Sequence, residues 1–144
     1  MQSKNGCVIL NTNKTQLFLM LNSSLFYVYF VAYGDCFHLS DNLASSFPVT
    51  EALMNDASLA MLSETLMVEL QQHAVRKTIT SRRGGTVDTI EYDEYYGARC
   101  KTTIDRIDHR LAQIYSFTPE EQDFIVNYDI KYRMGLNGTD TGDD

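Results

Sequence analysis

The segment 50-TEALMNDASLAMLSETLMVELQQHAVRK-77 predicts the longest helix of the chain, from about Glu51 to Lys77. Thr50 is a good N-cap residue, and the apolar residues that follow recur every three or four positions, as on one face of an α-helix. This stripe contains Leu59, Leu62, Leu66, Leu70 and His73, and it is widened by Leu53, Met61 and Met67. A helix this long in a small domain usually packs against another long helix, either in the same chain or in a second copy. The stripe therefore supplies candidate interface residues, which are Leu59, Leu62, Leu66 and Leu70.

Helices are also predicted before this segment. Residues 14–32 carry an apolar repeat with helical spacing, and residues 41–46 form a short helical turn. The apolar stretch inside 14–32 is interrupted by Asn22, Ser23 and Ser24, so its unbroken part is too short to span a bilayer. We expect a buried helix here and no membrane partner.

Two further helices are predicted after the long segment. The first begins at Thr102 or Thr103, and its apolar residues keep the same spacing. The second has the clearest boundary in the chain, 118-TPEE-121. Thr118 caps this helix, Pro119 takes its first position, and Glu121 completes a capping box.

Short β-branched runs predict a small sheet beside these helices. Strands are expected at residues 7–10, at residues 36–39 and from Val87 to Tyr92, and 81-SRRGG-85 is expected to be a basic, flexible turn. The sequence therefore predicts an α+β fold that is predominantly α, with four to five helices and a small short-stranded sheet. It is expected to form one domain over residues 1–135, followed by a disordered acidic tail at 136–144.

The charge is unevenly distributed along the 144 residues. The net charge of −7 disfavours extensive nucleic-acid binding, because phosphate neutralisation requires Lys and Arg. Residues 76–110 nevertheless hold eight basic and six acidic side chains, which leaves room for a local basic patch. The candidate DNA contacts are Arg76, Lys77, Arg82, Arg83, Arg99 and Lys101. The alternative for each of them is an ordinary solvated basic surface.

The cysteines and histidines indicate neither a disulfide framework nor a metal site. Three widely spaced cysteines without a CxxC pair fit a reduced, cytoplasmic setting. Cys36 and His38 would supply two metal ligands, but nothing nearby in the sequence completes a set of four. No metal is expected.

Catalytic motifs are absent from the sequence. Adenine methylation uses a Gly-rich cofactor turn and an Asn/Asp-Pro-Pro-aromatic loop, whereas this chain has two isolated prolines and one Gly pair. A metal-dependent nuclease is the weaker alternative, because Asp129-Ile130-Lys131 has acid-x-Lys spacing and Asp105 or Asp108 lies upstream. Those two acids alternate with Ile residues on a helix, where a solvated face is the simpler interpretation. We expect a protein that is not an enzyme and holds no cofactor.

Two stretches resemble a known family. The first comprises 21-LNSSLFYVYF-30 and 33-YGDCFHL-39, ending at Phe47-Pro48. The second comprises 104-IDRID-108 and 117-FTPEEQDFIVNYDIKYRMG-135. They resemble the late target-recognition region and the extreme C-terminus of large adenine-specific DNA methyltransferases, including fused restriction–modification enzymes. In that family a preceding catalytic domain carries the cofactor and methylation motifs, so the resemblance implies recognition without catalysis.

Two functions follow as expectations. The first is a non-catalytic DNA target-recognition-like module, or a remnant of one, that contacts double-stranded DNA or a catalytic methyltransferase subunit. The alternative is a protein–protein interaction module that forms a homodimer or binds a methyltransferase subunit. In this alternative the long Leu-striped helix, together with an aromatic cluster at residues 26–33, provides the contact surface.

Overall fold

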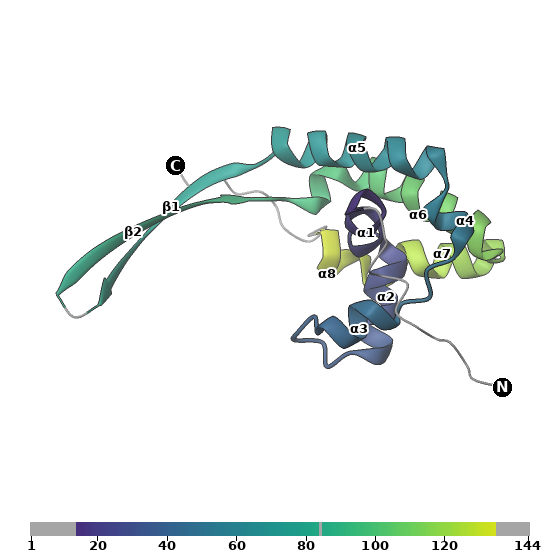
Figure 1. Ribbon diagram of the computed structural model, residues 1–144, viewed down its shortest axis with the longest axis horizontal. Helices are drawn as coiled ribbons and strands as arrows, with labels where there is room; N and C mark the ends of the chain where they lie inside the picture. Colours follow the sequence, from purple (N-terminus) through teal and green to yellow (C-terminus); the bar gives the residue numbers. More distant parts are fainter. Residues whose placement is uncertain (1–13, 84, 135–144) are drawn as a thin grey trace.

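The computed structural model describes residues 14–83 and 85–134 and shows a helical body from which a long β-hairpin projects (Figure 1). The body contains α1 (Lys14–Leu21), α2 (Ser24–Tyr33), α3 (Asp41–Ser46), α4 (Glu51–Met54), α5 (Ala57–Gln72), the 3₁₀ turn η2 (Gly97–Cys100), α6 (Lys101–Tyr115), α7 (Pro119–Asn127) and α8 (Ile130–Met134). The hairpin consists of β1 (Val75–Arg83) and β2 (Thr86–Glu94). The predicted class, α+β and predominantly α, is confirmed, although the described residues form eight α-helices instead of four or five.

The predicted helix over residues 14–32 is divided in two. Ser23 accepts a hydrogen bond from the backbone of Phe26 and so begins α2, while the Asn22 side chain donates to the carbonyl of Phe18. Short polar side chains compete for backbone hydrogen bonds in this way, which ends one helix and starts another. The two helices are bent by 70° relative to each other.

The predicted helix from Glu51 to Lys77 begins where expected, because Thr50 accepts from the backbone of Leu53 and caps α4 at Glu51. It is wrong in its continuity and at its C-terminal end. It breaks at Asp56, whose carboxylate accepts from the backbone of Leu59 and caps α5. Arg110 of α6 donates to the same carboxylate, and this hydrogen bond is the main reason why the pKa of Asp56 is lowered. At the other end α5 stops at Gln72, and Val75, Arg76 and Lys77 already belong to β1.

The main core forms where α1, α5 and α6 pack together. Leu59, Leu62, Leu66 and Leu70 are all less than a tenth exposed, and they lie against residues of α1 and α6, including Leu19 and Ile107. The partner of the Leu stripe is therefore within the same chain. The stripe is not an exposed interface, which corrects the expectation for these four residues. A second, smaller cluster contains Met20, Phe26 and Phe47.

The predicted boundary at Thr118 is confirmed in detail. Thr118 accepts from the backbone of Glu121, and the Glu121 carboxylate accepts from the backbone of Thr118, which completes the capping box.

The expected strands and the expected tail have different outcomes. Residues 36–39 do not form a strand, whereas the expected strand and tail at residues 7–10 and 136–144 lie outside the described residues.

Candidate interaction surface on the hairpin arm

The hairpin of β1 and β2, called the arm below, consists of nine-residue strands paired from Val75↔Glu94 to Arg83↔Thr86. At 3.2–3.4 Å per residue, each strand spans about 30 Å. Both strands are rich in Thr, Val and Ile, the β-branched residues that favour extended backbone. Gly85 adopts φ +86° between them, in the left-handed region that tight hairpin turns use.

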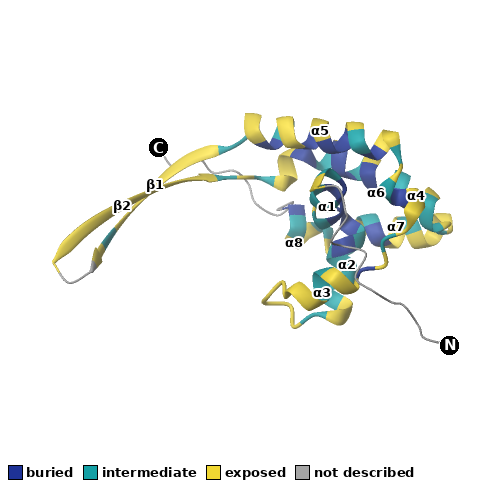
Figure 2. Cartoon of the chain, viewed as in Figure 1, coloured by how far each residue is buried: buried dark blue, intermediate teal, exposed yellow. Residues whose placement is uncertain are grey.

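Neither strand packs extensively on a helix among the described residues, so both faces of the arm meet solvent (Figures 1 and 2). Directly paired residues share a face, and alternate pairs point the same way. The apolar face of the arm comprises Val75, Ile79, Ile90 and Tyr92, together with Lys77, Ser81, Asp88 and Glu94. The polar face comprises Arg76, Thr78, Thr80, Arg82, Val87, Thr89, Glu91 and Asp93.

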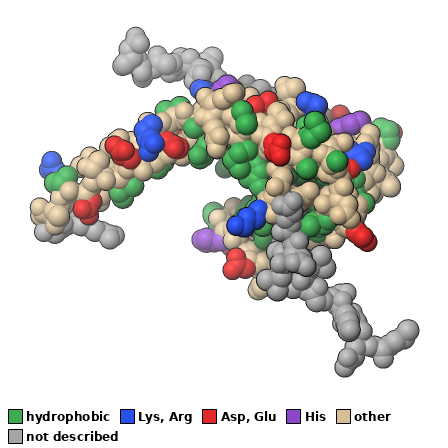
Figure 3. Space-filling view, turned by 45° about the horizontal axis from the view of Figure 1, so that its top comes forward, with side chains coloured by type: hydrophobic (Ala, Val, Ile, Leu, Met, Phe, Trp, Pro, Cys, Tyr) green, Lys and Arg blue, Asp and Glu red, His purple; other side chains and the backbone are tan. Residues whose placement is uncertain are grey.

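The centre of the apolar face is strongly exposed. Ile79 and Ile90 pair directly and are 51% and 56% exposed. Val75 and Tyr92, closer to the body, are each 38% exposed. Figure 3 shows hydrophobic side chains along the arm beside charged side chains of both signs. A contiguous apolar strip of this kind on a projecting element is typical of a protein interaction site.

Four of the six predicted DNA contacts lie on β1, but the arm is not a basic surface. The Arg76 guanidinium lies 3.0 Å from the carboxylate of Asp93, and the Lys77 ammonium lies 2.5 Å from that of Glu94. The Lys77 hydrogen bond lowers the pKa of Glu94, and the same bond raises the pKa of Lys77. Over residues 75–94 the four basic and four acidic side chains balance.

The remaining basic candidates differ in their surroundings. Arg82 is exposed near the tip of the arm, opposite Val87, whereas the Arg83 side chain lies outside the described part of the structure. Arg99 and Lys101 lie where the chain leads from β2 into α6. The Arg99 guanidinium is 5.1 Å from the centre of the Tyr96 ring, and Lys101 is 2.6 Å from Asp105. Four of the six candidates therefore lie on β1, and the other two lie in η2 and at the start of α6, just after the end of β2.

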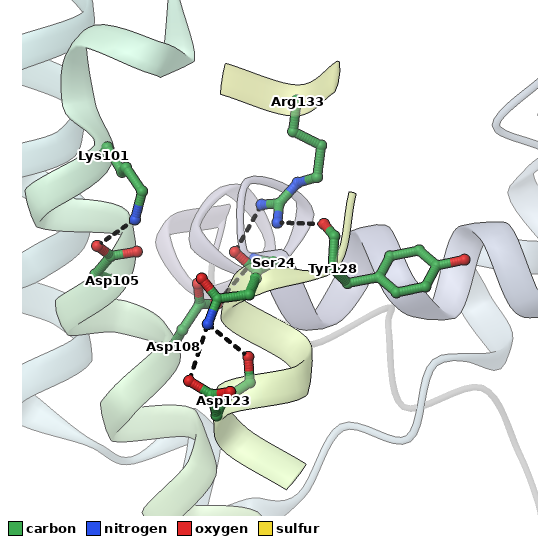
Figure 4. Close-up of polar contacts among 8 residues, drawn as sticks. Ser24, Lys101, Asp105, Asp108, Asp123, Tyr128 and Arg133 are labelled. Carbon is green, nitrogen blue, oxygen red and sulfur yellow. Dashed lines mark hydrogen bonds and ion pairs between the residues drawn. The ribbon is translucent and has the colours of Figure 1, made fainter. Parts of the chain in front are cut away.

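A buried carboxylate, Asp108, connects three helices of the body (Figure 4). Its Oδ1 accepts from the backbone of Ser24 at 2.8 Å, and Arg133 donates to the Ser24 hydroxyl at 2.6 Å. Oδ2 has no hydrogen-bond partner among the described residues. Burial raises the pKa of Asp108 to about 6, against the opposing effects of the Ser24 hydrogen bonds and the Arg133 charge. The expectation that Asp108 lies on a solvated helix face is therefore wrong.

The acids considered for a nuclease do not converge. Asp105 binds Lys101, Asp108 is buried against α2, and Asp129 accepts from the Tyr27 hydroxyl at 3.1 Å. In the described ranges no three His, Cys, Asp or Glu side chains are grouped as a metal ion would require. Cys36 and His38 are both exposed, and His38 lies against Asp35.

No single helix within residues 14–83 and 85–134 is long and apolar enough to cross a membrane. Among these described residues, only the bent pair of α1 and α2 reaches the necessary length and composition jointly, and it supplies Leu19, Met20 and Phe26 to the core. Comparisons with protein-family models, with curated proteins and with solved structures found no match for the chain.

The sequence predicts the second strand of the arm, at Val87 to Tyr92. It misses the first strand, because it assigns residues 75–77 to the long helix and residues 81–85 to a turn. A usable signal was present, because two runs rich in Thr, Val and Ile flank the dipeptide Gly84-Gly85. Two alternating strands around a Gly-Gly pair are a recognised hairpin pattern.

Proposed function

We propose that this chain is a non-catalytic protein-interaction module that binds its partner through the apolar face of the arm. The observation that carries the proposal is the exposed Ile79–Ile90 pair, on a strip that no helix of the described body covers. Removing apolar side chains from water is the main driving force of protein association. An isolated two-stranded hairpin is also only marginally stable in water, so a partner that covers one face would stabilise it.

The charges of the arm support this proposal. The Arg76–Asp93 and Lys77–Glu94 pairs join opposite charges across the strands, which favours the observed register and leaves little net charge for attracting phosphate. The net charge of −7 acts in the same direction, since it repels a polyanion at long range.

The resemblance to adenine-specific DNA methyltransferases indicates the setting in which the module works. In this proposal the arm docks within a methyltransferase assembly, onto a catalytic subunit or onto another copy of the chain. The contact surface differs from the one expected from the sequence, because the Leu stripe of α5 is already used inside the body.

Photo-crosslinking from the two faces of the arm tests the proposal. Benzoyl-phenylalanine is incorporated in cells at Ile90 on the apolar face or at Thr89 on the polar face. We expect covalent protein adducts from the Ile90 position and few from the Thr89 position, with mass spectrometry identifying the partner. Equal yields from the two positions, or no protein adduct from Ile90, would contradict the proposal.

DNA target recognition remains the second candidate, and one observation favours it. A two-stranded β-ribbon has the right width to enter the major groove, and β1 carries Arg76, Lys77, Arg82 and Arg83. If the arm binds duplex DNA, Arg82→Ala with Arg83→Ala weakens binding and reduces the salt dependence by about one unit of slope for each phosphate that is no longer neutralised. Unchanged affinity and slope in the double variant would exclude this mode of binding.

A further inference from the structure

We propose that four side chains where the arm joins the body act as a latch that favours the observed direction of the arm. They are Lys77, Glu94, Tyr96 and Arg99, called the root latch below. This inference rests on the proposed function in one respect, because the direction of the arm decides where its apolar face is presented.

Two short connections join the arm to the body at the same end of the body (Figure 1). On one side, Ala74 alone separates β1 from His73, the C-cap residue of α5. On the other side, Tyr95 and Tyr96 separate β2 from η2. Neither strand packs extensively on a helix among the described residues, so rotation about these backbone connections would turn the whole arm. Contacts across the connections therefore determine its direction.

The arm side of the latch depends on the carboxylate of Glu94, the last residue of β2. Lys77 of β1 lies 2.5 Å from this carboxylate, and the Tyr96 hydroxyl donates a hydrogen bond to it. The hydrogen bond to Glu94 is the main reason why the pKa of Tyr96 is raised. One carboxylate thus ties both strands of the arm to the connection that leads into η2.

The body side of the latch depends on Arg99 of η2. Its backbone N–H donates to the carbonyl of Tyr96 at 3.1 Å, and its guanidinium lies 5.1 Å from the centre of the Tyr96 ring. The next residue, Cys100, is buried in the main core, so η2 is anchored to the body. Tyr96 is therefore held to the body by its backbone and ring, while its hydroxyl holds the end of the arm.

Exposed contacts of this kind are individually weak, so the latch biases the direction of the arm without locking it. Loss of the Tyr96 hydroxyl should raise the population of other arm directions by about two- to fivefold. The free chain then presents the apolar face mainly in one direction, whereas a bound partner can still turn the arm. Such preorganisation lowers the entropic cost of docking.

Distances between spin labels on the arm and on the body test the latch. In a background with Cys7→Ser and Cys36→Ser, nitroxides are attached at Val87→Cys near the tip of the arm and at Met61→Cys on α5. Both positions are exposed, and the remaining Cys100 is buried. Double electron–electron resonance then measures the distribution of the distance between the two labels.

Variants of the latch should broaden this distribution. Tyr96→Phe removes only the hydroxyl, and Glu94→Gln removes the charge that attracts Lys77, so both should give a broader distribution than the unmodified chain. Tyr95→Phe is the matched control, because the Tyr95 side chain is 55% exposed and has no hydrogen-bond or ring partner among the described residues. It should leave the distribution unchanged.

Two further measurements separate the latch from general damage to the fold. Because Glu94 and Tyr96 act through the same contact, the double variant should be no broader than Glu94→Gln alone. A label pair within the body, Met61→Cys with Phe124→Cys, should give the same distribution in every variant. A distribution for Tyr96→Phe as narrow as that for Tyr95→Phe, or broadening that is additive in the double variant, overturns the latch.

Failure of this inference is distinguishable from failure of the proposed function. If the distribution does not depend on Tyr96 but Ile90 photo-crosslinks to a protein, the interaction module stands and the latch fails. If Ile90 gives no protein adduct but Tyr96→Phe broadens the distribution, the latch stands and the proposed function fails.

Discussion

The helical body and the arm place similar apolar residues in opposite environments. Leu59 and Leu66 of α5 are completely buried, whereas Ile79 and Ile90, further along the chain, are more than half exposed. In the body, α1 and α6 cover the apolar stripe of α5. Among the described residues, no helix packs in the same way against the apolar face of the arm. Stability is therefore concentrated in the body, and the capacity for further association is concentrated in the arm.

The comparison is tested most strongly by truncating one apolar side chain in each region. Leu66→Ala removes a fully buried side chain and should lower the free energy of unfolding by about 2–5 kcal/mol. Ile79→Ala removes a side chain that is already half exposed, so a decrease below about 1 kcal/mol is expected for the monomer.

Urea denaturation followed by far-ultraviolet circular dichroism measures both variants at a concentration where the chain is monomeric. Similar decreases for the two variants would mean that the arm is stabilised by contacts with the body, and the contrast between the regions would be wrong.

The next effect concerns the buried carboxylate of the body. Because the pKa of Asp108 rises from 3.8 to about 6 on folding, the folded state binds more protons than the unfolded state between those values. The free energy of unfolding contributed by this group therefore falls as the pH increases from about 4 to about 6, and it stays low above that range. The shift corresponds to roughly 3 kcal/mol at 1.36 kcal/mol per unit.

Asp108→Asn keeps an oxygen that accepts from the Ser24 backbone but removes the titration. The difference in unfolding free energy between the variant and the unmodified chain should increase from pH 4 to pH 6.5 and then become constant. Asp105→Asn, a change at a half-buried acid of the same helix that binds Lys101, is the matched control for removing a carboxylate from α6. A parallel pH profile for Asp108→Asn and the unmodified chain would contradict the assignment.

What the sequence predicts well is determined by local interactions. The cap at Thr118 depends on three neighbouring residues, and the sequence predicts it residue by residue. The breaks at Ser23 and Asp56 escape prediction because the apolar stripe continues through them, although both residues are good caps. Asp108 gives no local signal at all, since its burial depends on Ser24, which lies 84 residues away in the sequence.

The arm illustrates a different limit. Its strands can be inferred from the residues around Gly84-Gly85, but periodicity shows only which side chains share a face. Whether another element covers that face is decided by the packing of the whole chain. The prediction of a local basic patch also overlooks the acids of β2, because strand pairing brings Asp93 to 3.0 Å from Arg76.

A smaller effect is expected from the best-predicted boundary. Thr118→Ala removes the side chain that accepts from the Glu121 backbone, and the absence of such a cap costs about 1 kcal/mol. Thr118→Ser keeps the hydroxyl and should retain most of the stability. If the two variants are equally destabilised, the capping hydrogen bond contributes little and the methyl group of Thr118 accounts for the effect.

The smallest effect belongs to the polar face of the arm. The side chains of Arg76 and Asp93 are 63% and 40% exposed, so water and salt screen their attraction. A double-mutant cycle with Arg76→Ala and Asp93→Ala should give a coupling of only about 0.2–0.5 kcal/mol. Hydrogen exchange at the arm amides is the appropriate measurement, because opening of the arm need not unfold the body.

The same cycle discriminates between the two regions. Exchange of the amides in α5 and α6 should be unchanged in all three variants, while exchange of the β1 and β2 amides becomes slightly faster. A coupling well above 1 kcal/mol would mean that the ion pair stabilises the arm more than an exposed pair should. Faster exchange in the helices would mean that the arm and the body unfold together. In that second case the arm would be an integral part of one cooperative unit with the body.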